Sequence, residues 1–181
     1  MSPDLKATLF KVGVPLVTIA IVLLVSRARG FDLKKDIGLH WPRPRLVVLW
    51  MGVWIAWIAI GDWLGHLLHF GEPSHWKAYA AGIVVLRVLA IGILGPAAEE
   101  LVFRGILFAR LLKPIGPAAT IVATAAAWAA LHYSYDWLTL SQVFADGLIL
   151  GLARHQSRST NVPIAMHAVG NLFSIYQSLC A

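Results

Sequence analysis

The amino-acid sequence predicts an all-α protein, a polytopic transmembrane helix bundle of about six to seven membrane segments. We expect one integral membrane domain over residues 1–181. Of these residues, 59% are hydrophobic and 13% are charged, and the mean hydropathy is +0.72. A soluble domain carries about a quarter charged residues, so this chain has about half the usual share. Its apolar residues gather in runs of about 20, the length that crosses a bilayer as an α-helix.

The first two predicted spans cover about residues 7–26 and 46–69. The first lacks the small-residue cleavage site of a signal peptide, so we expect it to be retained. The tryptophans of the second suit the interfacial belts of a membrane. Six basic residues separate the two spans: Arg27, Arg29, Lys34, Lys35, Arg43 and Arg45.

Short cytoplasmic loops carry an excess of Lys and Arg, so we expect this basic segment in the cytoplasm and the N-terminus outside. We expect an integral protein of the prokaryotic cytoplasmic (inner) membrane. The net charge of +6 does not form a stripe on a soluble face. No nucleic-acid partner is therefore expected.

The third apolar run is interrupted by Gly95 and Pro96. Glycine commonly follows a helix end, and proline suits a first helical turn, so one helix should end near Leu94 and another should run from Pro96 to about Leu112. The two form either one bent crossing or a hairpin. We favour the bent crossing, because it places four cations inside: Arg110, Lys113, Arg154 and Arg158. Further segments are predicted at about 117–132, 138–153 and 161–179.

The sequence PAAEELVFRG, which starts at Pro96, places three charged residues among apolar ones. On a helix, Glu100 and Arg104 share a face with the acid on the N-terminal side, the favourable order for an ion pair. Glu99 is rotated by about 100° from Glu100, so Arg104 is not its natural partner. Charges inside a membrane are costly and tend to be functional. We therefore expect Glu100–Arg104 to be structural and Glu99 to be available for chemistry.

Two later apolar segments carry further polar residues. His132 ends the stretch AAAWAALH, four residues after Trp128, whereas His167 and Asn171 in AMHAVGN share one face of the last helix. Singly, each has a structural explanation, because histidines in bundles are usually hydrogen-bonded and a His–Asn pair can link helices. Jointly, a carboxylate, two imidazoles and an amide on three apolar helices predict a shared polar site.

In this order, the residues resemble the motifs of the CPBP family, the CAAX proteases and bacteriocin-processing enzymes, also called the Abi family. The motifs Glu-Glu-x-x-x-Arg, Phe-x-x-x-His and His-x-x-x-Asn are matched by Glu99, Glu100 and Arg104, by Trp128 and His132, and by His167 and Asn171. Trp128 replaces the usual phenylalanine and keeps an aromatic ring. The resemblance covers about residues 96–173, inside an expected catalytic core at about 78–180.

The resemblance implies an intramembrane endopeptidase, similar to the type II CAAX prenyl endopeptidases. Glu99 would activate a water molecule, and His132 would orient that water or relay its proton. His167 and Asn171 would stabilise the oxyanion. The expected supporting residues are Glu100, Arg104 and Trp128. The implied partners are membrane lipid and a membrane-anchored or lipidated protein or peptide substrate.

A metal-dependent form of this chemistry is an alternative. Glu99, His132 and His167 with a water molecule are ligands of the kind that hold catalytic zinc. The sequence contains no His-Glu-x-x-His, the commonest zinc-protease signature. We therefore favour a glutamate-type mechanism without a cofactor and keep zinc as the alternative.

Two further functions are alternatives. A non-catalytic membrane immunity or scaffold protein would keep the motifs as structure. A small proton-coupled transporter would use Glu99 as a relay, because intramembrane acids also mark ion pathways. The sequence shows no inverted repeat of the transporter type.

Other polar residues of the apolar segments are not assigned to the site. Asp62, His66 and His69 form a cluster that we interpret as the wet outer end of the second span. Arg87 is expected to snorkel to the interface or to pair with Asp146.

Overall fold

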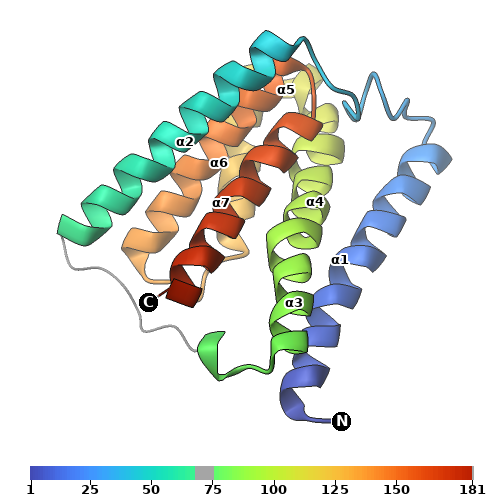
Figure 1. The fold of residues 1–181 in the computed structure, drawn as a ribbon. Coiled ribbons are helices and arrows are strands. Elements are labelled where there is room, and N and C mark those ends of the chain that lie inside the picture. Colours follow the sequence, from blue (N-terminus) through green and yellow to red (C-terminus); the bar gives the residue numbers. More distant parts are fainter. Residues whose placement is uncertain (68–75, 181) are drawn as a thin grey trace.

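The structure, a computed structural model, describes residues 1–67 and 76–180 (Figure 1). Within these ranges it contains helices and no strands, so the all-α prediction is confirmed. The α-helices are α1 (Pro3–Ala28), α2 (Pro44–Leu67), α3 (Ala81–Leu89), α4 (Gly95–Glu100), α5 (Phe108–Ala130), α6 (Trp137–Ser157) and α7 (Asn161–Cys180). A short 3₁₀ helix covers Trp76–Ala78, and two π-helical segments cover Ala90–Leu94 and Leu101–Leu107.

The helix break predicted near Leu94 is wrong. Helix α3 continues through the first π segment into α4, with Pro96 inside the helical path. The Gly95 N–H donates to the carbonyl of Ala90, five residues earlier, and this widened turn accommodates the proline, which has no N–H of its own. The helical path is instead kinked at Gly116, whose φ of 76° is a left-handed conformation that favours glycine.

Three helical stretches of the described residues are long and apolar enough to cross a membrane: Pro3–Ala28, Pro44–Leu67 and Ala81–Ala130. The predicted count of six to seven membrane segments is not confirmed. Helices α6 and α7 are nearly as long, but they carry polar residues along their length, such as Gln142 and Asp146 in α6.

Helix α7 is central to the bundle and contacts α2, α4 and α6, whereas α1 packs on α3 and α4 (Figure 1). The largest core cluster joins α2, α5, α6, α7 and the second π segment through eight buried residues: Trp50, Trp54, Phe103, Trp128, Leu150, Ala153, Val162 and Met166. The outer helices remain open to lipid, since 11% of the apolar window of α1 and of α2 is buried in the bundle.

The segment between α1 and α2 folds onto the end of the bundle where α6 ends and α7 begins (Figure 1). Ile37 is fully buried, and its carbonyl accepts a hydrogen bond from the Thr160 hydroxyl. The Arg154 Nη2 donates to the Asp36 carbonyl at 3.0 Å, and Arg110 lies over the Phe31 ring. The basic segment therefore lies at the same end of the bundle as these arginines, as expected for one bent crossing.

Candidate active site

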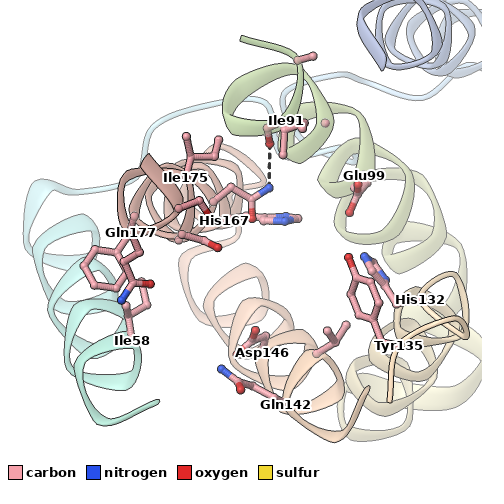
Figure 2. A pocket seen from close by; sticks show the side chains of 18 of the residues that line it. Ile58, Ile91, Glu99, His132, Tyr135, Gln142, Asp146, His167, Ile175 and Gln177 are labelled. Carbon is pink, nitrogen blue, oxygen red and sulfur yellow. Dashed lines mark hydrogen bonds between the residues drawn. The ribbon is translucent and has the colours of Figure 1, made fainter. Parts of the chain in front are cut away.

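The four residues predicted to be catalytic line one cavity of about 870 Å³ (Figure 2). Glu99 comes from α4, His132 from the turn after α5, and His167 and Asn171 from α7. Residues of α1, α2 and α6 complete the walls. The structure thus brings together side chains that lie up to 72 positions apart in the sequence, 171 minus 99.

Glu100 and Arg104 form the predicted ion pair, and both side chains are fully buried. The Arg104 Nη1 donates to Glu100 Oε1 at 3.0 Å, and Nη2 donates to the Gly147 carbonyl at 2.8 Å. His167 Nδ1 lies 3.0 Å from the same Glu100 oxygen. A buried carboxylate needs such partners to remain ionised, so Glu100 fixes α4 against α7.

Glu99 points to the cavity instead and is half-buried. Its Oε2 accepts a hydrogen bond from Trp128 Nε1 at 2.6 Å. No partner is described for Oε1, so one oxygen of the carboxylate is held and the other is available to a water molecule. The sequence predicts Trp128 to be a supporting aromatic residue, and the structure shows that its N–H is also a donor, which phenylalanine lacks.

His132 is oriented by its own helix. Its Nδ1 lies 3.1 Å from the Trp128 carbonyl, and a carbonyl only accepts, so the Nδ1–H donates. In the neutral ring, Nε2 then carries a lone pair and can accept from water or take up its proton. The Trp128 ring makes edge contacts with both His132 and His167, at centroid distances of 5.3 and 5.1 Å.

The contact between His167 and Glu100 also defines a tautomer. Ionised Glu100 only accepts, so His167 donates from Nδ1. Its Nε2 is then an acceptor in the neutral ring and a donor only in the imidazolium form. Stabilisation of an oxyanion by His167 would therefore require the charged ring.

Asn171 has a structural partner that the sequence analysis did not foresee. Its Nδ2 donates to the Ile91 carbonyl at 2.8 Å (Figure 2). That carbonyl lacks its usual donors, because the Gly95 N–H is directed to Ala90 and Pro96 has no N–H. One amide hydrogen of Asn171 thus satisfies the first π segment, which leaves the second for the cavity.

The second π segment has an equivalent anchor. The Phe108 N–H is directed to the carbonyls of Phe103 and Gly105, so it does not bond the Arg104 carbonyl, its usual partner four residues earlier. Arg154 Nε donates to the Arg104 carbonyl at 2.8 Å, and the Thr160 hydroxyl lies 3.3 Å away. Side chains of α6 and α7 therefore fix both ends of the turn that carries Glu99 and Glu100.

The zinc alternative can be tested against the side-chain arrangement. The described residues contain no group of three or more His, Cys, Asp or Glu side chains that could hold a metal ion. The recorded hydrogen bonds use Glu99 Oε2, His132 Nδ1 and His167 Nδ1, so the mismatch with zinc lies in the spacing of these side chains and not in their hydrogen bonds. The geometry of Glu99, His132 and His167 in this structure does not fit a zinc site.

Asp146 is a cavity residue that the sequence analysis left out. Its Oδ1 accepts from Trp57 Nε1 at 2.6 Å. The pairing suggested between Asp146 and Arg87 is wrong, since Arg87 Nε donates to Thr8 at 3.2 Å and the guanidinium lies over the Tyr79 ring. The sequence signal that indicates Asp146 as a candidate site residue is its position as a lone acid in an otherwise apolar stretch.

The predicted outer cluster of α2 lies partly on the same cavity. Asp62 lines it and accepts a hydrogen bond from Gln177 of α7. The exposed His66 lies 3.5 Å from Asp62. His69, the third member of the predicted cluster, lies outside the described residues.

Comparison with known proteins identifies the family of this chain. Residues 81–173, just over half of the 181-residue chain, match the family described as type II CAAX prenyl endopeptidase Rce1-like. An uncharacterized 24.3 kDa protein of Escherichia coli is 31% identical over 142 residues, which cover 74% of this chain and 61% of that protein. No solved structure matches the chain. With three helices suited to a membrane, this integral membrane protein belongs to the Rce1-like family of type II CAAX prenyl endopeptidases.

Proposed function

We propose that this protein is an intramembrane endopeptidase that hydrolyses a peptide bond of a membrane-anchored or lipidated protein or peptide. The observation that carries the proposal is the position of Glu99 on a shared cavity with His132, His167 and Asn171. Its carboxylate is held at one oxygen by Trp128. The other oxygen has no described partner, as a general base requires. Membership of the protease family supports the same reaction.

The proposed reaction needs no group beyond these residues and water. The water oxygen bonds to the carbonyl carbon of the substrate while Glu99 takes one water proton and His132 Nε2 orients the water. The resulting oxyanion accepts hydrogen bonds from the His167 imidazolium and from the free amide hydrogen of Asn171. The carbon–nitrogen bond then breaks, and the proton on Glu99 passes to the leaving nitrogen. The products are a carboxylic acid and an amine.

We place the protein in the prokaryotic cytoplasmic membrane, with the segment between α1 and α2 on the cytoplasmic side. The supporting observation is the collection of Arg110, Arg154 and that basic segment at one end of the bundle, as the positive-inside rule predicts. Lipid and a membrane-associated substrate are the proposed partners. No nucleic-acid partner is proposed.

Replacement of Glu99 by Gln tests the central assignment. We expect Glu99→Gln to lower cleavage by about a hundredfold to ten-thousandfold, the usual contribution of a general base, with thermal unfolding unchanged. Proteoliposomes containing candidate membrane-anchored peptides are analysed for products by mass spectrometry. Asp4→Asn, the same change at an exposed carboxylate of α1, is the matched control. Full cleavage by Glu99→Gln would refute the assignment.

Removal of metal ions tests the proposed absence of a cofactor. We expect the purified protein to keep its activity after exhaustive chelation, because the Glu99, His132 and His167 side chains do not form a zinc site in this geometry. Activity is measured on the same peptides before and after chelator treatment, with a known zinc protease as the positive control. Loss of activity that stoichiometric zinc restores would overturn the glutamate-type mechanism.

A further inference from the structure

Asp146 lies on the α6 wall of the cavity, a different wall from that of Glu99 (Figure 2). It is half-buried, and the proposed reaction gives it no task. Among the described residues its one recorded partner is Trp57, whose indole N–H donates to Oδ1 at 2.6 Å. Its Oδ2 therefore has no donor among the described residues.

The carboxylate of Asp146 also has no ion-pair partner among the described residues, and Arg104 and His167 act on it only at longer range. No Lys, Arg or His nitrogen of the described residues lies within 4.0 Å of it, since the ion pairs of that part of the chain involve Glu100 and Asp62. The nearby arginine, Arg104, is committed to Glu100 and to the Gly147 carbonyl. An unpaired acid inside a membrane bundle is costly and is usually matched by a cation.

The surroundings of Asp146 suit an incoming cationic side chain. The Trp57 ring beside it can contact a cation through its π face. Gln142, one helical turn earlier on α6, lines the same cavity and offers an amide oxygen. The Trp57 ring can stack on an ammonium or guanidinium group, and the Gln142 amide oxygen can accept a hydrogen bond from it. Neither side chain adds positive charge to the cavity.

We propose that Asp146 forms a subsite for a basic residue of the substrate, a lysine or arginine close to the peptide bond that Glu99 hydrolyses. The subsite deepens the proposed protease function and rests on it. A substrate cation would supply the partner that the protein withholds from Asp146. The single lysine on the cavity wall, among the described residues, is Lys11 of α1, and it does not lie within 4.0 Å of Asp146.

The test compares membrane-anchored peptides that carry one lysine, or norleucine in its place, at each position within about four residues of the cleaved bond. Hydrogen bonds to charged groups contribute about 1.5–3 kcal/mol, and about 1.4 kcal/mol is a tenfold effect. We therefore expect wild type to prefer lysine over norleucine at least about tenfold in kcat/KM at one position. Asp146→Asn should reduce this ratio to near one.

Three variants separate charge from structure. Asp146→Asn keeps an oxygen that can accept from Trp57, so it removes mainly the charge. Trp57→Phe removes that hydrogen bond and keeps the charge, so it should retain the preference for lysine, as should Asp146→Glu. A lysine preference that is absent from wild type at every position, or that persists in Asp146→Asn, would overturn the subsite.

Binding keeps this test separate from the test of the protease function. The same peptides, labelled with a fluorophore, are titrated against Glu99→Gln and against Glu99→Gln/Asp146→Asn in nanodiscs. Lysine peptides that bind at least about tenfold tighter, with the difference lost in the double variant, support the subsite even when wild type cleaves no peptide. Equal binding of lysine and norleucine peptides refutes it, whatever the outcome for cleavage.

Discussion

Glu99 and Glu100 are chemically identical neighbours with opposite surroundings. Glu100 is fully buried and shares one oxygen between a guanidinium and an imidazole. Glu99, turned by about 100° on the helix, is half-buried and accepts from one indole N–H. Full burial with Arg104 suits Glu100 to the proposed structural role, whereas the cavity leaves one oxygen of Glu99 accessible to a water molecule.

Trp128 is expected to position Glu99 as well as to fill space. Trp128→Phe removes the hydrogen bond to Glu99 Oε2 but keeps an aromatic ring between His132 and His167. Because hydrogen bonds to charged groups contribute about 1.5–3 kcal/mol, we expect kcat to fall by about tenfold while the thermal unfolding temperature changes little. Single-turnover cleavage in proteoliposomes measures the effect on the chemical step.

The comparison variant for this prediction is Trp54→Phe. Its indole N–H is buried without a hydrogen-bond partner among the described residues, so the same change there removes no bond to a catalytic group. Equal activity of Trp128→Phe and wild type would show that the indole N–H does not position Glu99. Loss of the folded state in Trp128→Phe would show that the whole indole is needed for folding and would contradict the expected small change in thermal unfolding.

At the scale of elements, the two π segments explain how α4 is held in place. Each segment frees one backbone carbonyl, and each of these accepts from a side chain of another helix: Ile91 from Asn171, and Arg104 from Arg154. Unsatisfied carbonyls are costly inside a membrane. The α4 turn is therefore tied to α7 on one side and to α6 on the other.

The coupling between Pro96 and Asn171 can be measured with a double-mutant cycle. Asn171→Ala leaves the Ile91 carbonyl without a donor, so the free energy of unfolding should fall by about 1–3 kcal/mol. Pro96→Ala supplies an N–H that can donate to Ile91, so the further loss caused by Asn171→Ala in that background should be much smaller. Reversible denaturation in mixed micelles measures all four proteins.

Asn171→Asp is the matched control for this cycle. Its side chain has nearly the same shape, but an ionised carboxylate cannot donate to the Ile91 carbonyl. We expect it to destabilise the protein at least as much as Asn171→Ala. Additive effects of Pro96→Ala and Asn171→Ala would contradict the link between the proline and the freed carbonyl.

The sequence predicted those parts of the site that depend on spacing within one helix. The ion pair of Glu100 and Arg104, and the shared face of His167 and Asn171, both follow from residues four positions apart. The convergence of three helices on one cavity was also expected, because a carboxylate, two imidazoles and an amide stand out on three apolar segments. The hydrogen bond from the Trp128 indole N–H to Glu99 could not be predicted from residue spacing, because it depends on how α4 and α5 pack.

The helix break near Leu94 was a wrong prediction for a definable reason. Gly-Pro pairs commonly separate helices, and the local signal gives no sign of a partner elsewhere in the chain. Here Asn171, 80 positions after Ile91, accommodates the defect. A local breaker signal is thus overruled by a tertiary hydrogen bond, and the helix continues through Pro96.

At the scale of the whole molecule, charge is distributed unevenly between the two ends of the bundle. The segment between α1 and α2 lies at one end, together with Arg154 and Arg110. Figure 1 shows both chain ends at the other end. The positive-inside rule then predicts that the basic end lies in the cytoplasm and that the ends of α1 and α7 lie on the outer side.

The one cysteine of the chain makes this orientation measurable. Cys180 is exposed in the last turn of α7, at the end opposite the basic segment. In intact spheroplasts we expect a membrane-impermeant maleimide to label Cys180 without permeabilisation. In Cys180→Ala/Lys34→Cys, where the thiol lies in the exposed part of the basic segment, labelling should require permeabilised cells.

Cys180 and Lys34→Cys report on opposite ends of the bundle, so their labelling defines the orientation of the protein. A third position, Arg110, then reports on the number of crossings. One bent crossing from Ala81 to about the kink at Gly116 puts Lys34 and Arg110 on the same side, whereas a hairpin would separate them. An Arg110→Cys variant in the Cys180→Ala background should therefore show the protection of Lys34→Cys. Labelling of Arg110→Cys from outside would contradict the single crossing, and protection of Cys180 with exposure of Lys34→Cys would reverse the orientation.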